Sequence, residues 1–89
     1  MTIESAASTM KRVLNDCAYD FGSTSYQDRC DSIRVTYTSS TINVYVTMTV
    51  RDPYYDSEVK ENIMSTVRSI RTQYEIPYGI NVSVTYNRR

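Results

Sequence analysis

The sequence predicts an α+β domain, a two-layer sandwich in which two helices pack on one face of a three-stranded antiparallel sheet. Apolar residues recur at helical spacing over residues 3–21 and 59–74. β-Branched residues alternate with polar ones over residues 33–50 and 80–86, as in half-buried strands. With 89 residues, the chain has room for a single αββαβ domain, residues 1–89, around one core.

The first helix is expected near the N-terminus. Thr2 is a suitable N-cap because its hydroxyl can accept a hydrogen bond from an amide of the first turn, and Gly22 is a suitable stop. The polar segment 23–31 has no period and is predicted to be a loop. The helical stripe consists of Ile3, Ala6, Ala7, Met10, Val13, Leu14, Cys17, Ala18 and Phe21.

A β-hairpin is expected next, with Ser39 and Ser40 at its turn. Strict alternation of β-branched and polar residues, broken by a short polar turn, is typical of this motif. The apolar rows are Ile33, Val35 and Tyr37 in the first strand, and Ile42, Val44, Val46, Met48 and Val50 in the second. The opposite face carries Arg34, Thr36, Thr38, Asn43, Tyr45, Thr47, Thr49 and Arg51.

Pro53 ends the second strand because proline has no amide hydrogen for the ladder, and Asp52 or Ser57 could cap the helix that follows. Pro77 and Gly79 end this helix. Its apolar positions are Val59, Ile63, Met64, Val67, Ile70 and Tyr74, and the third strand then presents Ile80, Val82, Val84 and Tyr86 on one face.

Each predicted strand is apolar on one face only, so both helices should cover the same face of the sheet. The hairpin makes the first two strands antiparallel, and the second helix returns the chain for the third. Placing the third strand beside the first gives an antiparallel sheet in the order 2-1-3, which we prefer. The alternative places it beside the second strand as a parallel neighbour.

The order of elements resembles that of BON domains, KH-like domains, the ring-building modules of secretion and sporulation machines, and the alkaline-shock protein family. The likeness covers residues 3–86 and is one of topology. Gly22 and Gly79 are the only glycines, so the Gly-x-x-Gly loop of KH domains is absent. Residues 39–41 lack the glycine that BON domains place in that turn. No family is therefore assigned.

Residue types argue against catalysis. Histidine is absent, which excludes Ser-His-Asp and Cys-His schemes and the commonest metal ligand. We therefore expect neither an enzyme nor a bound metal or cofactor. Cys17 and Cys30 are expected to be free thiols, with a single disulfide as the alternative. A calcium site at Asp28 and Asp31 is a weaker possibility.

The charges balance, ten basic against ten acidic, while eight of the basic residues are Arg and nine residues are Tyr. Arg and Tyr are enriched at protein interfaces. We therefore expect a non-enzymatic structural, assembly or protein-interaction module that associates with itself or joins a larger complex, such as a phage or virus particle or a ring. The expected contact residues are Arg34, Tyr45, Thr47, Thr49 and Arg51 on the sheet, with Tyr54 and Tyr55 at the entrance of the second helix.

The alternative function is a KH-like nucleic-acid-binding domain, in which Arg34, Arg51, Arg88 and Arg89 would contact phosphates. Nucleic acid is the less expected partner because a neutral domain gains little electrostatic affinity for it. No signal peptide or membrane-spanning run is recognised, so a soluble protein without a membrane partner is expected, and its compartment stays open.

Overall fold

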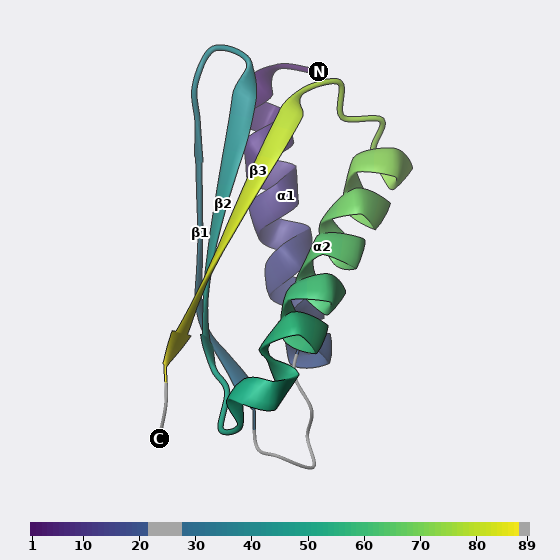
Figure 1. Cartoon of the computed structure of the whole chain (residues 1–89). Helices are drawn as coiled ribbons and strands as arrows, with labels where there is room; N and C mark the ends of the chain where they lie inside the picture. The colour runs from purple at the N-terminus through teal and green to yellow at the C-terminus, as the bar shows by residue number, and fades with distance from the viewer. Residues whose placement is uncertain (22–27, 88–89) are drawn as a thin grey trace.

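The computed structural model describes residues 1–21 and 28–87. Its elements are α1 (Ile3–Cys17), the 3-10 helix η1 (Ala18–Asp20), β1 (Arg29–Tyr37), β2 (Thr41–Thr49), the 3-10 helix η3 (Pro53–Tyr55), α2 (Asp56–Gln73) and β3 (Gly79–Asn87). Both α-helices lie on one side of the sheet, which gives two layers (Figure 1). The α+β class is thus confirmed. Within the described residues, neither helix combines the length and apolar character that crossing a membrane requires.

The sheet has the order β1-β2-β3, with β1 antiparallel and β3 parallel to the central strand. The preferred prediction, a fully antiparallel sheet in the order 2-1-3, is therefore wrong, and the parallel alternative is the one observed. The strands' side chains give the reason. β1 carries Arg29, Asp31 and Arg34, and charged side chains are typical of edge strands. β2 has no charge, and its inward side chains Ile42, Val44, Val46 and Met48 are all buried.

A β-bulge at Asp31 sets the register of β1. Cys30 pairs with Met48 and Ser32 pairs with Thr47, so Asp31 is the extra residue between them. Because of this insertion, both Cys30 and Ile33 contact the core although they are three positions apart. The predicted loop over residues 23–31 is wrong for residues 29–31, which belong to β1, while residues 22–27 lie outside the described part of the chain.

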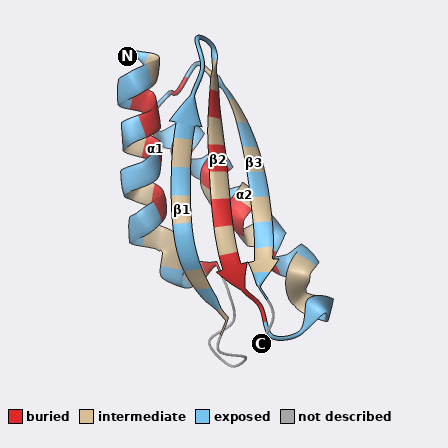
Figure 2. Ribbon diagram, turned by 90° about the vertical axis from the view of Figure 1, so that its left-hand side faces the viewer, coloured by how far each residue is buried: buried red, intermediate tan, exposed pale blue. Residues whose placement is uncertain are grey.

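The core lies between the two helices and the central strand. Its buried residues are Ala6, Ala7, Met10 and Leu14 of α1, Val59, Ile63, Val67 and Ile70 of α2, the inward row of β2 with Val50, and Phe21 and Ile76. Figure 2 shows this pattern, with buried residues along β2 and only half-buried or exposed ones along β1 and β3. The outer two strands therefore leave part of their apolar surface uncovered.

The helix ends are fixed by local hydrogen bonds. Thr2 caps α1 as predicted, because its hydroxyl accepts from the amide of Ser5 at 3.1 Å. Of the two candidate caps for the second helix, Asp52 caps the 3-10 helix η3 that precedes α2, accepting from the Tyr54 amide at 3.0 Å, whereas Ser57 lies inside α2, whose N-cap residue is Tyr55. α2 ends in a turn where Glu75 adopts a φ of 52°, a conformation that favours glycine.

Candidate interaction surface

The face of the sheet turned away from the helices, here called the outer face, brings three of the predicted contact residues together: Arg34, Tyr45 and Thr47. Neither α1 nor α2 covers it (Figure 2). Cross-strand pairing arranges it in four rows of one residue from each strand: Thr36, Asn43 and Asn81; Arg34, Tyr45 and Ser83; Ser32, Thr47 and Thr85; Arg29, Thr49 and Asn87. Hydroxyl and amide groups thus make up most of the outer face.

Tyr45 and Arg34 form the centre of the outer face. Tyr45 lies on the central strand, directly opposite Arg34 of β1. The guanidinium carbon of Arg34 lies 4.6 Å from the centroid of the Tyr45 ring, which is the geometry of a cation–π contact. The tyrosine ring is half-buried and the arginine exposed. The guanidinium therefore covers one face of the ring.

The carboxylate of Asp31 joins all three strands at one end of the outer face. Its Oδ2 accepts from the Thr49 hydroxyl at 2.5 Å and from the Asn87 amide at 3.3 Å, and its Oδ1 accepts from Arg29 Nε at 2.9 Å. These bonds, that of Thr49 most and that of Arg29 next, lower the pKa of Asp31. The bulge therefore provides an ionised carboxylate that ties β1 to β2 and β3.

The structure separates the predicted contact residues into groups. Arg34, Tyr45 and Thr47 lie together on the outer face. Thr49 is only 6 % exposed and its hydroxyl is bonded to Asp31, so it contributes little surface. Arg51 lies beyond the end of β2, where its side chain is exposed and its main-chain amide donates to Asp28 Oδ1 at 3.2 Å.

Tyr54 and Tyr55 form a separate corner at the entrance of α2. Their rings meet edge to face, with centroids 5.1 Å apart and planes at 84°. Tyr54 is 82 % exposed, whereas Tyr55 packs against the core. The corner lies near the C-terminal end of β3, because the Tyr86 hydroxyl donates to the carbonyl of Asp56 at 3.1 Å. The two groups of predicted residues therefore do not form one site.

The free edge of β3 is a surface whose residues were not identified from the sequence. The carbonyl of Asn87 accepts from the Val50 amide at 3.1 Å, so Asn87 turns its main-chain groups toward β2. Because main-chain direction alternates along a strand, Ile80, Val82 and Val84 turn theirs away from β2. The sequence did contain a signal for an unprotected edge, because no residue of β3 is charged or a proline.

The two thiols are free in the structure and both are partly buried. Burial, with the nearby charge of Asp31, raises the pKa of Cys30. Raised thiol pKa values accompany low reactivity at neutral pH, because the thiolate is the nucleophile. Cys30 is therefore suited to packing rather than to nucleophilic chemistry.

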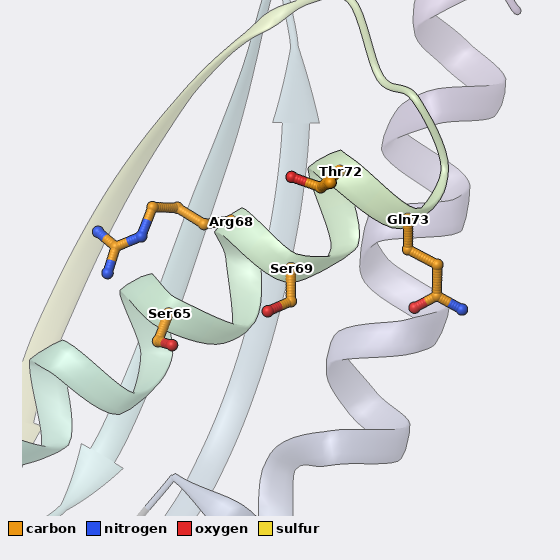
Figure 3. A pocket seen from close by; sticks show the side chains of 5 residues that line it. All are labelled: Ser65, Arg68, Ser69, Thr72 and Gln73. Atoms are coloured by element: carbon orange, nitrogen blue, oxygen red, sulfur yellow. The ribbon is translucent and has the colours of Figure 1, made fainter.

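A shallow depression on the exposed side of α2 is lined by Ser65, Arg68, Ser69, Thr72 and Gln73 (Figure 3). Arg68 forms an ion pair with Glu61 at 2.8 Å, and the depression is open to solvent. Across residues 1–21 and 28–87, no three His, Cys, Asp or Glu side chains gather in a way that could hold a metal ion. In comparisons with known proteins, the chain matches no family model, no curated protein and no solved structure.

Proposed function

We propose that this chain is a non-enzymatic assembly module that associates with copies of itself, or with other subunits of a larger complex, through the outer face of its sheet. The observation that carries the proposal is the uncovered outer face with the Arg34–Tyr45 pair at its centre. A particle or ring made of many subunits is the setting in which such a module would work.

The chemistry of the outer face suits a protein partner. Tyrosine and arginine are among the residues enriched at the energetic centres of protein interfaces. Here they are surrounded by side chains that both donate and accept hydrogen bonds, as the 3.4 Å contact from Asn81 to Asn43 illustrates. An aromatic side chain loses little conformational entropy on binding, and the ring of Tyr45 already packs against the guanidinium of Arg34.

The titratable groups of the sheet support a role without catalysis. A general acid or base needs a pKa near the working pH. Asp31 instead has a lowered pKa, and both of its oxygens accept hydrogen bonds from the protein. Cys30 has a raised pKa, which disfavours its nucleophilic form. These groups are better suited to holding the sheet together than to turnover.

The alternative, a KH-like nucleic-acid-binding domain, has less support. Sheets that bind single strands stack several bases on aromatic rings. On the outer face, the Tyr45 ring already carries the guanidinium of Arg34. Balanced charge gives little attraction to phosphate. Arg88 and Arg89 lie outside the described residues, so their part is tested directly by replacing both and measuring binding to single-stranded RNA at low salt. Absence of binding by the unmodified chain removes this alternative.

Site-specific photo-cross-linking tests the proposed surface. A photoreactive amino acid in place of Thr47, in the middle of the outer face, should yield an adduct with a defined mass, either a second copy or one other subunit. The same label at Ser69 on the exposed side of α2 serves as the matched control and should give little adduct. Equal labelling from both positions, or none from Thr47, contradicts the proposal.

A further inference from the structure

The two edges of the sheet differ in how they are protected. The edge strand β1 has charged side chains and a bulge, both of which discourage pairing with another strand. β3 has neither a charge nor a proline, and it stays in unbroken register with β2 from Gly79 to Asn87. Of the two edges, β3 is the one suited to accept another strand.

The inward side chains of β3 are only half covered. Ile80, Val82 and Val84 pack against the core but remain partly exposed, whereas their neighbours on β2 are fully buried. A strand added beside β3 would cover this remaining apolar surface and extend the core. The same three residues turn their main-chain groups toward the open edge, so the apolar surface and the hydrogen-bonding groups coincide.

We propose that β3 pairs antiparallel with β3 of a second copy of this chain, about a two-fold axis at Val82. The pairing joins the two sheets into one of six strands, with a β3 from each copy at its centre. Val82 then lies opposite Val82 of the other copy, and Ile80 of each copy lies opposite Val84 of the other. Each pair exchanges two main-chain hydrogen bonds. This inference rests on the proposed role in assembly and assigns a second contact surface, distinct from the outer face.

A second copy is the occupant that the strand itself favours. A two-fold interface brings the same patch together from both subunits, so it must be complementary to itself. The uncharged β3 can meet a copy of itself without opposing like charges. Antiparallel pairing about Val82 places aliphatic side chains opposite aliphatic ones on the inner side, and Asn81 opposite Ser83 on the outer face. The axis avoids the end of β3, where Tyr86 bonds to Asp56 of α2.

Two proline substitutions test the inference. Val44 of β2 pairs with Val35 on one side and with Val82 on the other, so Val35 and Val82 occupy equivalent positions on the two edge strands. The amide of Thr38 donates to Thr41, so Val35 turns its main-chain groups to the free edge of β1, as Val82 does on β3. Proline is tolerated on an edge strand when the lost amide faces solvent. Val82→Pro and Val35→Pro are therefore the same substitution at equivalent positions of the two edge strands. Neither removes a hydrogen bond to β2.

At equal concentration, sedimentation equilibrium should find the same mass for the unmodified chain and for Val35→Pro, and a smaller mass for Val82→Pro, which retains only association through the outer face. Circular dichroism and cooperative unfolding check that each variant is folded. A monomeric unmodified chain, a Val82→Pro variant with the same mass as the unmodified chain, or an equal loss of mass in both variants overturns the inference. Cross-linking from Thr47 does not depend on pairing at β3, so it tests the outer-face proposal independently of these results.

Amide hydrogen exchange on the unmodified chain gives a second test that needs no variant. In the dimer, the amides of Ile80, Val82 and Val84 should exchange more slowly than those of Ile33, Val35 and Tyr37, which face the free edge of β1. Dilution should remove that difference. Equally fast exchange at the two edges at high concentration overturns the pairing, whatever the fate of the proline variants.

Discussion

The hydroxyl of Thr49 donates to Oδ2 of Asp31 at 2.5 Å, joining the central strand to the bulge of β1. Thr49 is buried, and the Asp31 carboxylate also accepts hydrogen bonds from the side chains of Arg29 and Asn87. The bulge that would otherwise weaken the ladder thus supplies an acidic group that bonds to all three strands. Asp31 orders the end of the outer face nearest the start of β1.

Replacing Asp31 should change how stability depends on pH. Its pKa is lowered in the folded protein, so the ionised form stabilises the fold. That stabilisation is complete above the pKa of an unfolded aspartate, about 4, and is lost as the pH falls through the lower pKa of the folded state. Asp31→Asn should therefore lower the free energy of unfolding at neutral pH, and its difference from the unmodified chain should shrink in acid.

Chemical denaturation across the acidic range measures this effect. Asp16→Asn, on the exposed side of α1, serves as the control and should not reproduce the pH-dependent difference. If the Asp31→Asn deficit stays constant down to the lowest pH, the carboxylate's charge does not contribute to the network as described.

Glu75→Gly should stabilise the protein by on the order of 1 kcal/mol. Glu75 has a φ of 52°, where a side chain crowds the backbone and glycine does not. The turn itself is held by bonds from the Glu75 amide to Thr72 and from the Ile76 amide to Arg71, which the substitution leaves intact. Thermal or denaturant unfolding measures the gain, and Glu75→Ala should show no comparable increase. A loss of stability in Glu75→Gly contradicts the strain.

Alkylation of Cys30 should be slow at neutral pH, because burial and then the charge of Asp31 raise the pKa of the thiol. In a Cys17→Ala background, the rate should rise only above the pH at which an exposed cysteine reacts. Adding Asp31→Asn should shift this profile to lower pH by removing the negative charge. Stopped-flow or mass-spectrometric alkylation rates test it, and an unchanged profile in the double variant rules out the charge effect.

Arg34 and Tyr45 should be coupled energetically. A double-mutant cycle of Arg34→Ala and Tyr45→Leu should give a coupling energy of about 0.5–1 kcal/mol, as for exposed cation–π pairs. The contact of 4.6 Å between guanidinium and ring is the reason. Unfolding free energies of the four proteins provide the measurement. Pairing Arg29→Ala with Tyr45→Leu, two residues in different rows of the outer face, is the control cycle. Additive effects of the Arg34 and Tyr45 changes contradict the contact.

Periodicity in the sequence was enough to predict both helices and all three strands, but it missed the first residues of β1, where the bulge at Asp31 interrupts the alternation. Met10 and Leu14 of the predicted helical stripe, and Val44 and Val46 of the predicted second strand, are buried as expected. Strand order could not be predicted this way, because β3 has the same direction and the same apolar face whether it lies beside β1 or β2. The charges at Arg29 and Asp31 were the signal that places β1 at an edge.

The contact surface was predictable only in part. Arg34 and Tyr45 lie on opposing strands of the predicted hairpin, and the structure brings them together. Thr49 looked equivalent to Thr47 in the alternation, but the bulge places Asp31 beside it and takes up its hydroxyl. A search for strict two-residue alternation does not detect a single inserted residue. It would be detected only if Cys30 and Ile33 were recognised as facing the same side of the sheet.

Sedimentation equilibrium of the unmodified chain, over the widest concentration range that its solubility allows, tests the central claim most directly. Self-association predicts a mass that rises from that of the 10.3 kDa monomer to that of a dimer or larger assembly as the concentration increases. A single monomeric mass at every concentration would contradict it.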